Sequence, residues 1–123
     1  MIGLGTDILH TPRLKPVLDR QGERFVRRIL TPEEFSQYQQ SKQPVRLLAK
    51  RFAAKEAVAK ALGTGIGRGV SWQDIHIRHN QSGAPLVELS GGAQQRAQEL
   101  GGSEVLISLA DEQDYVIAFA ALR

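Results

Sequence analysis

The chain has 123 residues, of which 41% are hydrophobic and 24% are charged, and its formal net charge is +3. We expect a single domain spanning residues 1–123, because this length suffices for one folded unit and not for two. The lack of cysteine excludes disulfide bonds and thiolate metal sites, and no apolar run is long enough to cross a membrane.

The first ten residues predict a strand with one acidic position. Hydrophobic side chains alternate over residues 2–9, and Asp7 falls on the same face as Gly3 and Gly5. Two glycines on one face leave room for another group to approach the backbone, whereas an aspartate that caps the following turn is the structural alternative. Because no basic segment and long apolar stretch of a signal peptide occur here, we expect a cytoplasmic protein.

A basic helical segment is predicted from residue 12 to about residue 29, with a break near Gly22. Four arginines in it are seven, four and four residues apart, which would align them on a helix: Arg13, Arg20, Arg24 and Arg28. Such a ridge suits an acidic protein helix or a nucleic-acid backbone, and a solvated helix face is the alternative. Phe25 is the lone aromatic residue of this segment, which disfavours binding of single-stranded nucleic acid by stacking.

Two further helices are predicted over residues 31–40 and 45–62. Thr31 and Glu34 form the pattern of a capping box at the start of the first. The second is rich in alanine, and Gly63 stands where a left-handed C-terminal cap is expected.

Glu56 and Lys60 are four residues apart and therefore share one face of the long helix. A surface ion pair, contributing about 0.3–0.5 kcal/mol, is one interpretation. The small apolar residues around them and Phe52 beside Glu56 indicate instead that the carboxylate borders packed surface, where it needs a partner such as Lys60 or a metal ion. The spacing alone leaves both interpretations open.

A glycine-rich loop, Gly63-Thr64-Gly65-Ile66-Gly67-Arg68-Gly69, follows the long helix. It lacks the Gly-Lys-Ser/Thr ending of a P-loop and follows a helix rather than a strand, so neither common nucleotide-binding fingerprint applies. Its backbone N–H groups could still hold phosphate oxygens, and a flexible connection is the alternative.

The remaining chain predicts two antiparallel hairpins and a short helix. The strands are expected at residues 72–78 with 86–89 and at 105–109 with 115–122, and the helix at 92–100. Helices in the first half packed on an antiparallel sheet make an α+β fold. The three histidines show no metal-ligand spacing, and we assign them no role.

Positive charge is concentrated in the first two thirds of the chain. Residues 1–79 carry 14 Lys/Arg and 7 Asp/Glu, a balance of +7, whereas residues 80–123 carry 2 and 6, a balance of −4. The basic part favours a polyanionic partner, which could be a nucleic acid, a nucleotide or an acidic protein.

Several of these segments together resemble one known family. The segments are Gly3-Leu-Gly-Thr-Asp7-Ile, Arg13, Arg28-Ile-Leu-Thr31 and Arg51-Phe-Ala-Ala-Lys-Glu56-Ala-Val-Ala-Lys60-Ala-Leu-Gly-Thr-Gly-Ile-Gly67. In this order, with the two acidic motifs about fifty residues apart, they resemble the short, trimeric type of the 4'-phosphopantetheinyl transferase superfamily, the holo-acyl-carrier-protein synthases. Any one segment is weak evidence, but the set is specific and the likeness covers nearly the whole chain.

The resemblance implies a fold, a metal site and a set of binding residues. Asp7 and Glu56 would bind Mg²⁺, with Mn²⁺ also suited to their oxygens, and Lys60 would lie near the diphosphate. The coenzyme A contacts would come from Arg51, Lys60, Gly63, Thr64, Gly65 and Asp111. The family also implies a homotrimer with each site between two subunits.

The reaction implied by the resemblance moves the 4'-phosphopantetheine group of coenzyme A onto a serine of apo-acyl carrier protein, for fatty acid synthesis. Asp7, Glu56 and Lys60 would be catalytic, and the serine proton would pass to Glu56 or to a metal-bound water. The acidic carrier protein would dock on Arg13, Arg20, Arg24 and Arg28, with Phe25 as an apolar anchor. No nucleic-acid partner is implied.

One departure from the family pattern concerns Asp111. Many relatives carry Ser-x-x-His in the penultimate strand, whereas this chain has Ser108-Leu-Ala-Asp111. A histidine base is therefore not expected here, and Asp111 is assigned to the ribose or to a neighbouring lysine. Two rival interpretations stay open from the sequence: a basic domain that binds RNA or DNA, and a relative that binds coenzyme A without turnover.

Overall fold

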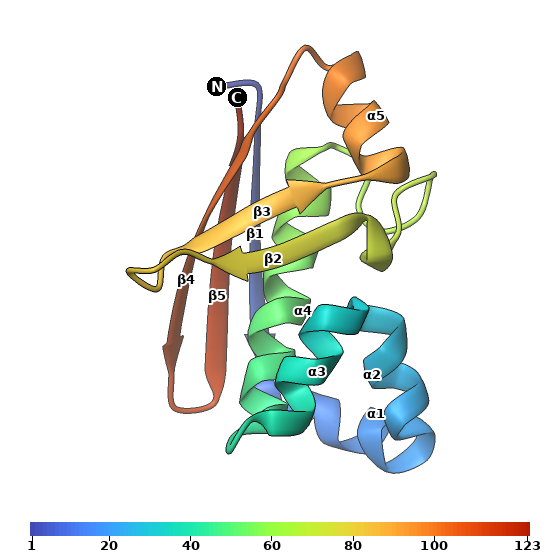
Figure 1. Ribbon diagram of the computed structural model, residues 1–123, viewed down its shortest axis with the longest axis vertical. Helices are drawn as coiled ribbons and strands as arrows, with labels where there is room; N and C mark the ends of the chain where they lie inside the picture. Colours follow the sequence, from blue (N-terminus) through green and yellow to red (C-terminus); the bar gives the residue numbers. More distant parts are fainter.

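The computed structural model describes all residues from 1 to 123, and Figure 1 shows how its elements are arranged. In chain order they are β1 (Gly3–His10), a 3-10 turn (Thr11–Arg13), α1 (Leu14–Gln21), α2 (Glu23–Ile29), α3 (Pro32–Gln40), α4 (Pro44–Ala61), a second 3-10 turn (Trp72–Asp74), β2 (Ile75–His79), β3 (Pro85–Leu89), α5 (Gly91–Glu99), β4 (Val105–Glu112) and β5 (Tyr115–Leu122). The expected α+β fold is confirmed.

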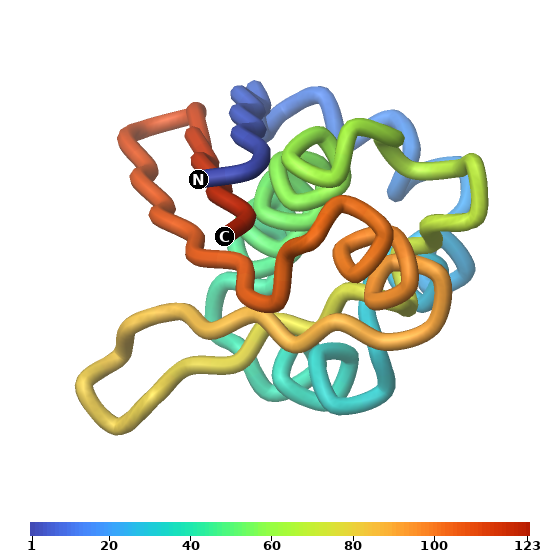
Figure 2. Tube along the Cα trace, turned by 90° about the horizontal axis from the view of Figure 1, so that it is seen from above, coloured from blue at the N-terminus to red at the C-terminus, as the bar shows by residue number.

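The strands form two separate antiparallel units. β1, β5 and β4 make a three-stranded sheet in that order, and β2 pairs only with β3. Viewed from above in Figure 2, the loop between β2 and β3 extends away from the rest of the chain. α1, α2 and α3 gather at one end of the molecule and α5 lies at the other (Figure 1).

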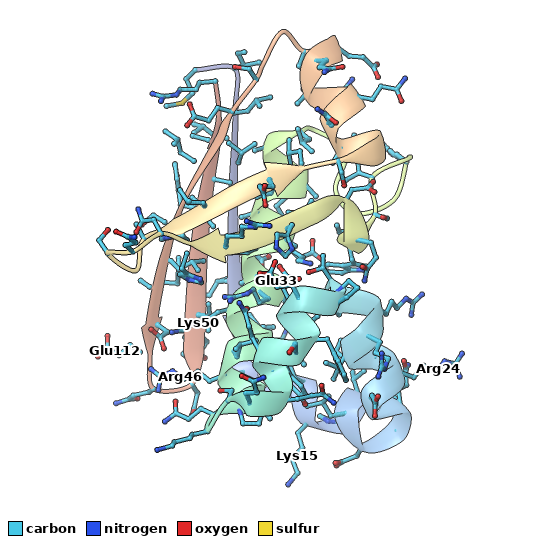
Figure 3. All side chains as sticks on the ribbon, viewed as in Figure 1. Lys15, Arg24, Glu33, Arg46, Lys50 and Glu112 are labelled. Carbon is cyan, nitrogen blue, oxygen red and sulfur yellow. The ribbon has the colours of Figure 1, made fainter.

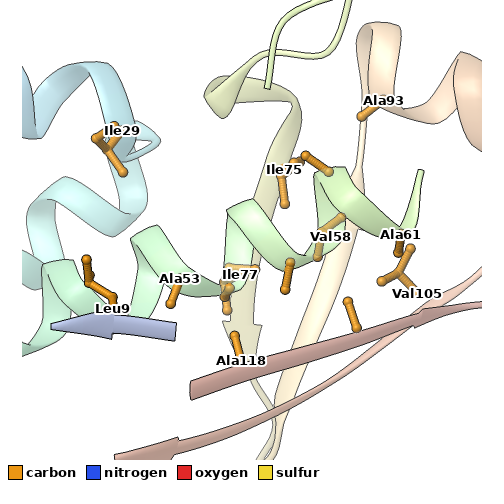
Figure 4. Close-up of a cluster of buried hydrophobic side chains, with 14 of the residues drawn as sticks. Leu9, Ile29, Ala53, Val58, Ala61, Ile75, Ile77, Ala93, Val105 and Ala118 are labelled. Atoms are coloured by element: carbon orange, nitrogen blue, oxygen red, sulfur yellow. The ribbon is translucent and has the colours of Figure 1, made fainter. Parts of the chain in front are cut away.

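Helix α4 is the centre of the molecule because it packs between the two sheets. One side contacts β1 and β5, and another contacts α2, α3 and β2. A side chain on Gly3 or Gly5 would overlap the carbonyl oxygens of Ala61 and Ala57, so these two glycines permit the helix to lie directly on β1. Small core residues such as Ala53, together with larger ones from β2 and β4, fill the space around the helix (Figure 4).

The outer face of the three-stranded sheet is apolar and uncovered. Strongly exposed side chains on it include Leu4 at 52%, Ile8 at 64% and Phe119 at 43% of their full accessible area. Leu106 and Ile117 extend this face across β4 and β5. Exposed apolar side chains gathered on one face are typical of an interaction site.

Local sequence signals explain several of the element boundaries. The capping box between Thr31 and Glu34 forms as expected, with the hydroxyl of Thr31 accepting from the Glu34 amide and the Glu34 carboxylate accepting from the Thr31 amide. Gly63 has φ +78°, as a helix cap requires. The predicted strand from residue 72 was wrong in its first three residues, because a second capping box from Ser71 to Asp74 winds them into a 3-10 turn.

The arginine ridge predicted on the first helical segment was wrong in its geometry. Gly22 adopts φ +56° and ends α1, so the segment continues as a separate helix, α2. Arg13 and Arg20 therefore lie on a different element from Arg24 and Arg28. The four side chains are exposed but do not form one continuous row along a helix.

Candidate active site

Asp7 lies on the face of β1 that meets α4. It follows Gly3 and Gly5 on that face, and its side chain keeps only 15% of its accessible area. An ionised carboxylate that is this enclosed requires a cationic partner. The structural alternative, in which Asp7 caps the following turn, does not occur, because the first turn has no side-chain cap.

Lys60 supplies one such partner from the last turn of α4. Its ammonium group donates to the carbonyl oxygen of Thr6 at 2.9 Å and to Oδ1 of Asp7 at 3.1 Å. The ion pair considered between Glu56 and Lys60 does not form, since the lysine reaches across to β1 instead. Lys60 is about half exposed, so its charge also faces whatever binds in front of the strand.

Glu56 stands one helical turn before Lys60 and faces the same region. Burial and, to a smaller extent, the negative charge of Asp7 raise the pKa of Glu56, while Lys60 lowers it by a lesser amount. The Glu56 carboxylate has no ion pair within the chain. The structure thus brings Asp7, Glu56 and Lys60 together from sequence positions about fifty residues apart, with two like charges facing each other.

This donor set fits a hard divalent cation. The chain has no cluster of three or more Asp, Glu, His or Cys side chains, so a zinc site closed by four protein ligands is not formed. Two carboxylates suit Mg²⁺ or Mn²⁺, which retain waters and take further oxygens from a bound substrate. The residue types present are therefore those that such an ion needs.

The first three residues of the glycine-rich loop cap α4 with their backbone amides. The amide of Gly63 donates to the carbonyl of Lys60, and the amides of Thr64 and Gly65 both donate to the carbonyl of Ala59. These three amides are therefore engaged by the helix. A substrate can still approach the loop closely, because Gly65 has nothing within 4 Å of the position where a side chain would begin.

Asp111 is held by two cations of the first half of α4. Arg46 forms a salt bridge with its carboxylate, and Lys50 lies 3.8 Å from the same oxygen. The hydrogen bond from Arg46 lowers the pKa of Asp111. Figure 3 shows Arg46 and Lys50 pointing from α4 towards the end of the β4–β5 hairpin. The sequence predicted a neighbouring lysine as one possible partner of Asp111, and Lys50 is near it, but Arg46 was not predicted.

A cavity of about 270 Å³ lies beside this cluster, and Arg51 borders it. Its lining residues are Ser41, Gln43, Arg46, Leu47, Lys50, Arg51 and His79. Arg51 is only 5% exposed; it donates to Gln37 at 3.1 Å, and its Nε has no partner. Burial and the charges of Arg51 and Lys50 lower the pKa of His79, as expected in a region of strong positive potential.

The predicted docking residues lie apart from this cavity, on α1, α2 and the turn before them. Arg24 projects away from the molecule in Figure 3, and Lys15 does so from α1. Phe25 is half-buried, with its ring 6.4 Å from that of Phe52 on α4. This end of the molecule therefore presents exposed positive charge around an aromatic side chain.

Comparison with known proteins identifies the family. The model of the 4'-phosphopantetheinyl transferase superfamily matches residues 3–120. The chain belongs to this superfamily. A holo-[acyl-carrier-protein] synthase of Shewanella frigidimarina is 53% identical over 123 residues, covering all of this chain and 98% of the relative. The relative of Shewanella oneidensis is 54% identical, with all of this chain and 97% of that protein covered.

Solved structures of other transferases of this superfamily share the fold. The crystal structure of holo-[acyl-carrier-protein] synthase from Neisseria meningitidis matches with a TM-score of 0.93 at 44% identity, covering all of this chain and 99% of that one. The Helicobacter pylori synthase, solved in complex with coenzyme A, matches with a TM-score of 0.84 at 28% identity, covering 98% of this chain and 99% of the other.

These relatives establish the activity. This transferase moves the 4'-phosphopantetheine group from coenzyme A to acyl carrier protein. The interpretation as a nucleic-acid-binding domain without enzymatic activity is therefore wrong. No helix of the structure combines the length and the apolar character that crossing a membrane requires.

Proposed function

We propose that Asp7 and Glu56 hold one Mg²⁺ or Mn²⁺ ion, against which this transferase binds the diphosphate of coenzyme A. The observation that carries the proposal is the approach of two carboxylates and Lys60 at the contact between β1 and α4. The repulsion between Asp7 and Glu56 persists without a cation and is relieved by one. A bound divalent ion would neutralise charge on the diphosphate as the carrier-protein serine attacks its β-phosphorus.

Lys60 would stabilise negative charge on the departing 3',5'-ADP. Its ammonium group is held by Thr6 and Asp7 and is still about half exposed, so it can donate a further hydrogen bond. A pre-positioned charge of this kind needs little rearrangement when the phosphorus–oxygen bond breaks. The catalytic assignment therefore comprises Asp7, Glu56 and Lys60.

Coenzyme A would extend from this site along the chain's basic residues. Coenzyme A would pack closely against the backbone of Gly63, Thr64 and Gly65 in the glycine-rich loop. The amides of these residues already donate to α4, so van der Waals contact and not hydrogen bonding would be their contribution. Arg51, with an unpartnered Nε beside a positively charged cavity, is suited to a phosphate of the nucleotide. Asp111 would orient Arg46 and Lys50 towards that phosphate.

We further propose a homotrimer in which other copies of the chain cover the apolar outer face of the three-stranded sheet. β1 carries Asp7 on its inner face and Leu4 and Ile8 on the outer one, and it is an edge strand of that sheet. An interface formed there would lie beside the site, as expected if each site sits between two subunits.

The acidic carrier protein would dock on the exposed positive charge of α1, α2 and the turn before them. Arg13, Arg20, Arg24 and Arg28 are exposed around the half-buried Phe25. Complementary charge of this kind accelerates association and orients the partner.

Removal of the metal tests this proposal directly. Protein stripped of divalent ions should fail to add phosphopantetheine to apo-acyl carrier protein, as followed by mass spectrometry, and Mg²⁺ or Mn²⁺ should restore the transfer. Glu33→Gln changes an exposed carboxylate of α3 and is the control. Its rate of transfer should depend on the metal ion as that of the unmodified protein does. Full transfer by metal-free protein would refute the proposed site.

A further inference from the structure

An ion pair that the proposed chemistry does not use lies inside the molecule. Lys55 and Glu34 are both fully buried, and the lysine Nζ lies 2.6 Å from Oε1 of the glutamate. The same ammonium group donates to the carbonyl oxygen of Ile29 at 2.8 Å and to that of Trp72 at 3.1 Å. Lys55 therefore uses its donors on three acceptors, which come from α3, the end of α2 and the 3-10 turn before β2.

The Glu34 carboxylate is equally well satisfied. Oε1 also accepts from the amide of Thr31 at 2.8 Å, and Oε2 accepts from the amide of Ile77 at 2.8 Å. The pair thus joins α4 to α2, α3 and β2 through hydrogen bonds of defined direction. Three donors of the chain thus engage the two oxygens of this carboxylate.

The pair adjoins the proposed metal site on α4. Lys55 and Glu56 are consecutive, so their side chains leave the helix about 100° apart. Glu56 faces Asp7 on β1, whereas Lys55 points to the opposite layer of helices and β2. A rotation of α4 by roughly 10° would move an atom near the outer radius of the helix by roughly 1 Å.

On the β1 side of α4, apolar packing resists such a rotation only weakly. Beside the larger Leu48 and Val58, the buried apolar positions of α4 are all alanines: Ala49, Ala53, Ala54, Ala57, Ala59 and Ala61. On the β1 side, the helix meets the glycines Gly3 and Gly5. Side chains this small allow close approach but interdigitate little, so directional polar contacts act together with Leu48 and Val58 to set the angle of the helix.

We propose that Lys55 and Glu34 are positioning residues for the transfer reaction: they fix the rotation of α4, so that Glu56 and Lys60 face Asp7 at the distance that the bound diphosphate requires. The inference rests on the proposed function of those three residues. Since the ammonium of Lys55 also holds the carbonyl of Ile29, it ties the end of α2, on the docking side, to the same helix.

This role differs from simple stabilisation. Well-packed apolar residues often replace a buried ion pair with little loss of stability, because they also remove its desolvation cost. They cannot, however, replace the direction of its hydrogen bonds. A displacement of 1 Å at a reacting group can cost about 100-fold in rate. When the pair is replaced as a unit, the activity of the fully folded protein should therefore fall, which a purely stabilising pair would not cause.

The test is the double variant Lys55→Met with Glu34→Leu in the full chain. Its Tm should fall, because the amides of Thr31 and Ile77 and the carbonyls of Ile29 and Trp72 lose their side-chain partners, so kcat is compared well below that Tm, where the variant is folded. The kcat of phosphopantetheine transfer should fall about 100-fold. The Kd of coenzyme A, measured by calorimetry, should change less than about threefold, because its binding is spread over many contacts. An exposed pair replaced in the same way, Arg123→Ala with Glu104→Ala, should leave all three values unchanged.

If the double variant does not fold, a second variant provides the test. Lys55→Arg keeps the positive charge but is longer, so it should displace α4 and lower kcat about tenfold at an unchanged Kd for coenzyme A. A kcat within twofold of the unmodified protein, in whichever of these variants folds, overturns the positioning role. Glu56→Gln is assayed alongside: normal turnover there refutes the proposed metal site, whereas normal turnover in the positioning variants alone refutes only this inference.

Discussion

Two glutamates that contact α4 or belong to it differ in how completely the protein satisfies them. Glu34 is fully buried and accepts hydrogen bonds from Lys55, Thr31 and Ile77. Glu56 follows Lys55 directly in the sequence, but it has no ion pair and faces the carboxylate of Asp7. The comparison teaches that burial of a charge does not by itself mark a functional group. The carboxylate whose electrostatic needs the chain leaves unmet is the one suited to an external cation.

The largest effect is expected from changes to the two carboxylates of the proposed metal site. Glu56→Gln or Asp7→Asn should lower kcat/KM for transfer by at least about 1,000-fold, because the charge that holds the metal is removed from a preorganised site. The Tm of Glu56→Gln should stay equal or rise, since this change relieves the repulsion between the two carboxylates without breaking an ion pair. Transfer to apo-acyl carrier protein by mass spectrometry and thermal unfolding measure the two effects. Near-normal turnover would remove the altered residue from the mechanism.

A change to Glu34, whose carboxylate is fully hydrogen-bonded, should instead lower the stability of the protein. Glu34→Gln leaves Lys55 buried without a counter-charge and places an amide where only acceptors fit, so the free energy of unfolding in urea should fall by about 3–5 kcal/mol. Glu23→Gln, which breaks the exposed pair with Arg27, should cost less than about 1 kcal/mol. A loss at Glu34 as small as that at Glu23 would contradict the buried network.

The uncovered apolar face of the three-stranded sheet, like Glu56, lacks a partner within the chain. Phe119→Lys puts a charge on the uncovered side of β5 and should weaken self-association at least about 100-fold, or about 2.7 kcal/mol. Sedimentation velocity should show the trimer giving way to monomer, with loss of transfer. Phe119→Leu keeps the face apolar and should retain the trimer. Unchanged assembly of the lysine variant would place the interface elsewhere.

The smallest effect is expected from the exposed arginines, which we propose bind the acidic carrier protein. Arg24→Glu should raise the KM for acyl carrier protein about tenfold, or about 1.4 kcal/mol, and should flatten its dependence on salt. Arg123→Glu reverses a charge at the C-terminus, near the opposite end of the molecule from α1 and α2 (Figure 1), and should leave that KM unchanged. A change confined to the KM for coenzyme A would show that Arg24 is not a docking residue.

The features that the sequence predicted correctly depend on neighbouring residues. The capping box at Thr31, the cap at Gly63 and the break at Gly22 each follow from side chains within a few positions. The glycines before Asp7 predicted a close approach, which α4 makes. Where a local signal was overlooked, as with the capping box from Ser71 to Asp74, the predicted element was wrong.

The features that it did not predict depend on partners distant in the chain. Lys60 meets Asp7 across 53 residues, whereas helical spacing suggested Glu56 as its partner. Lys55 finds Glu34 across 21 residues, and Arg46 finds Asp111 across 65. No periodicity specifies such contacts, because they arise only when the helix has packed between the two sheets. The assignment of Asp7 and Glu56 to one site came from the family resemblance.

Binding of Mn²⁺, followed by electron paramagnetic resonance in the presence of coenzyme A, tests most directly whether Asp7 and Glu56 share one ion. The unmodified protein should bind one Mn²⁺ per site, and Asp7→Asn and Glu56→Gln should each weaken that binding at least about tenfold, a loss of about 1.4 kcal/mol or more. Tight binding that survives both substitutions would show that the metal lies elsewhere and that the two carboxylates serve another purpose.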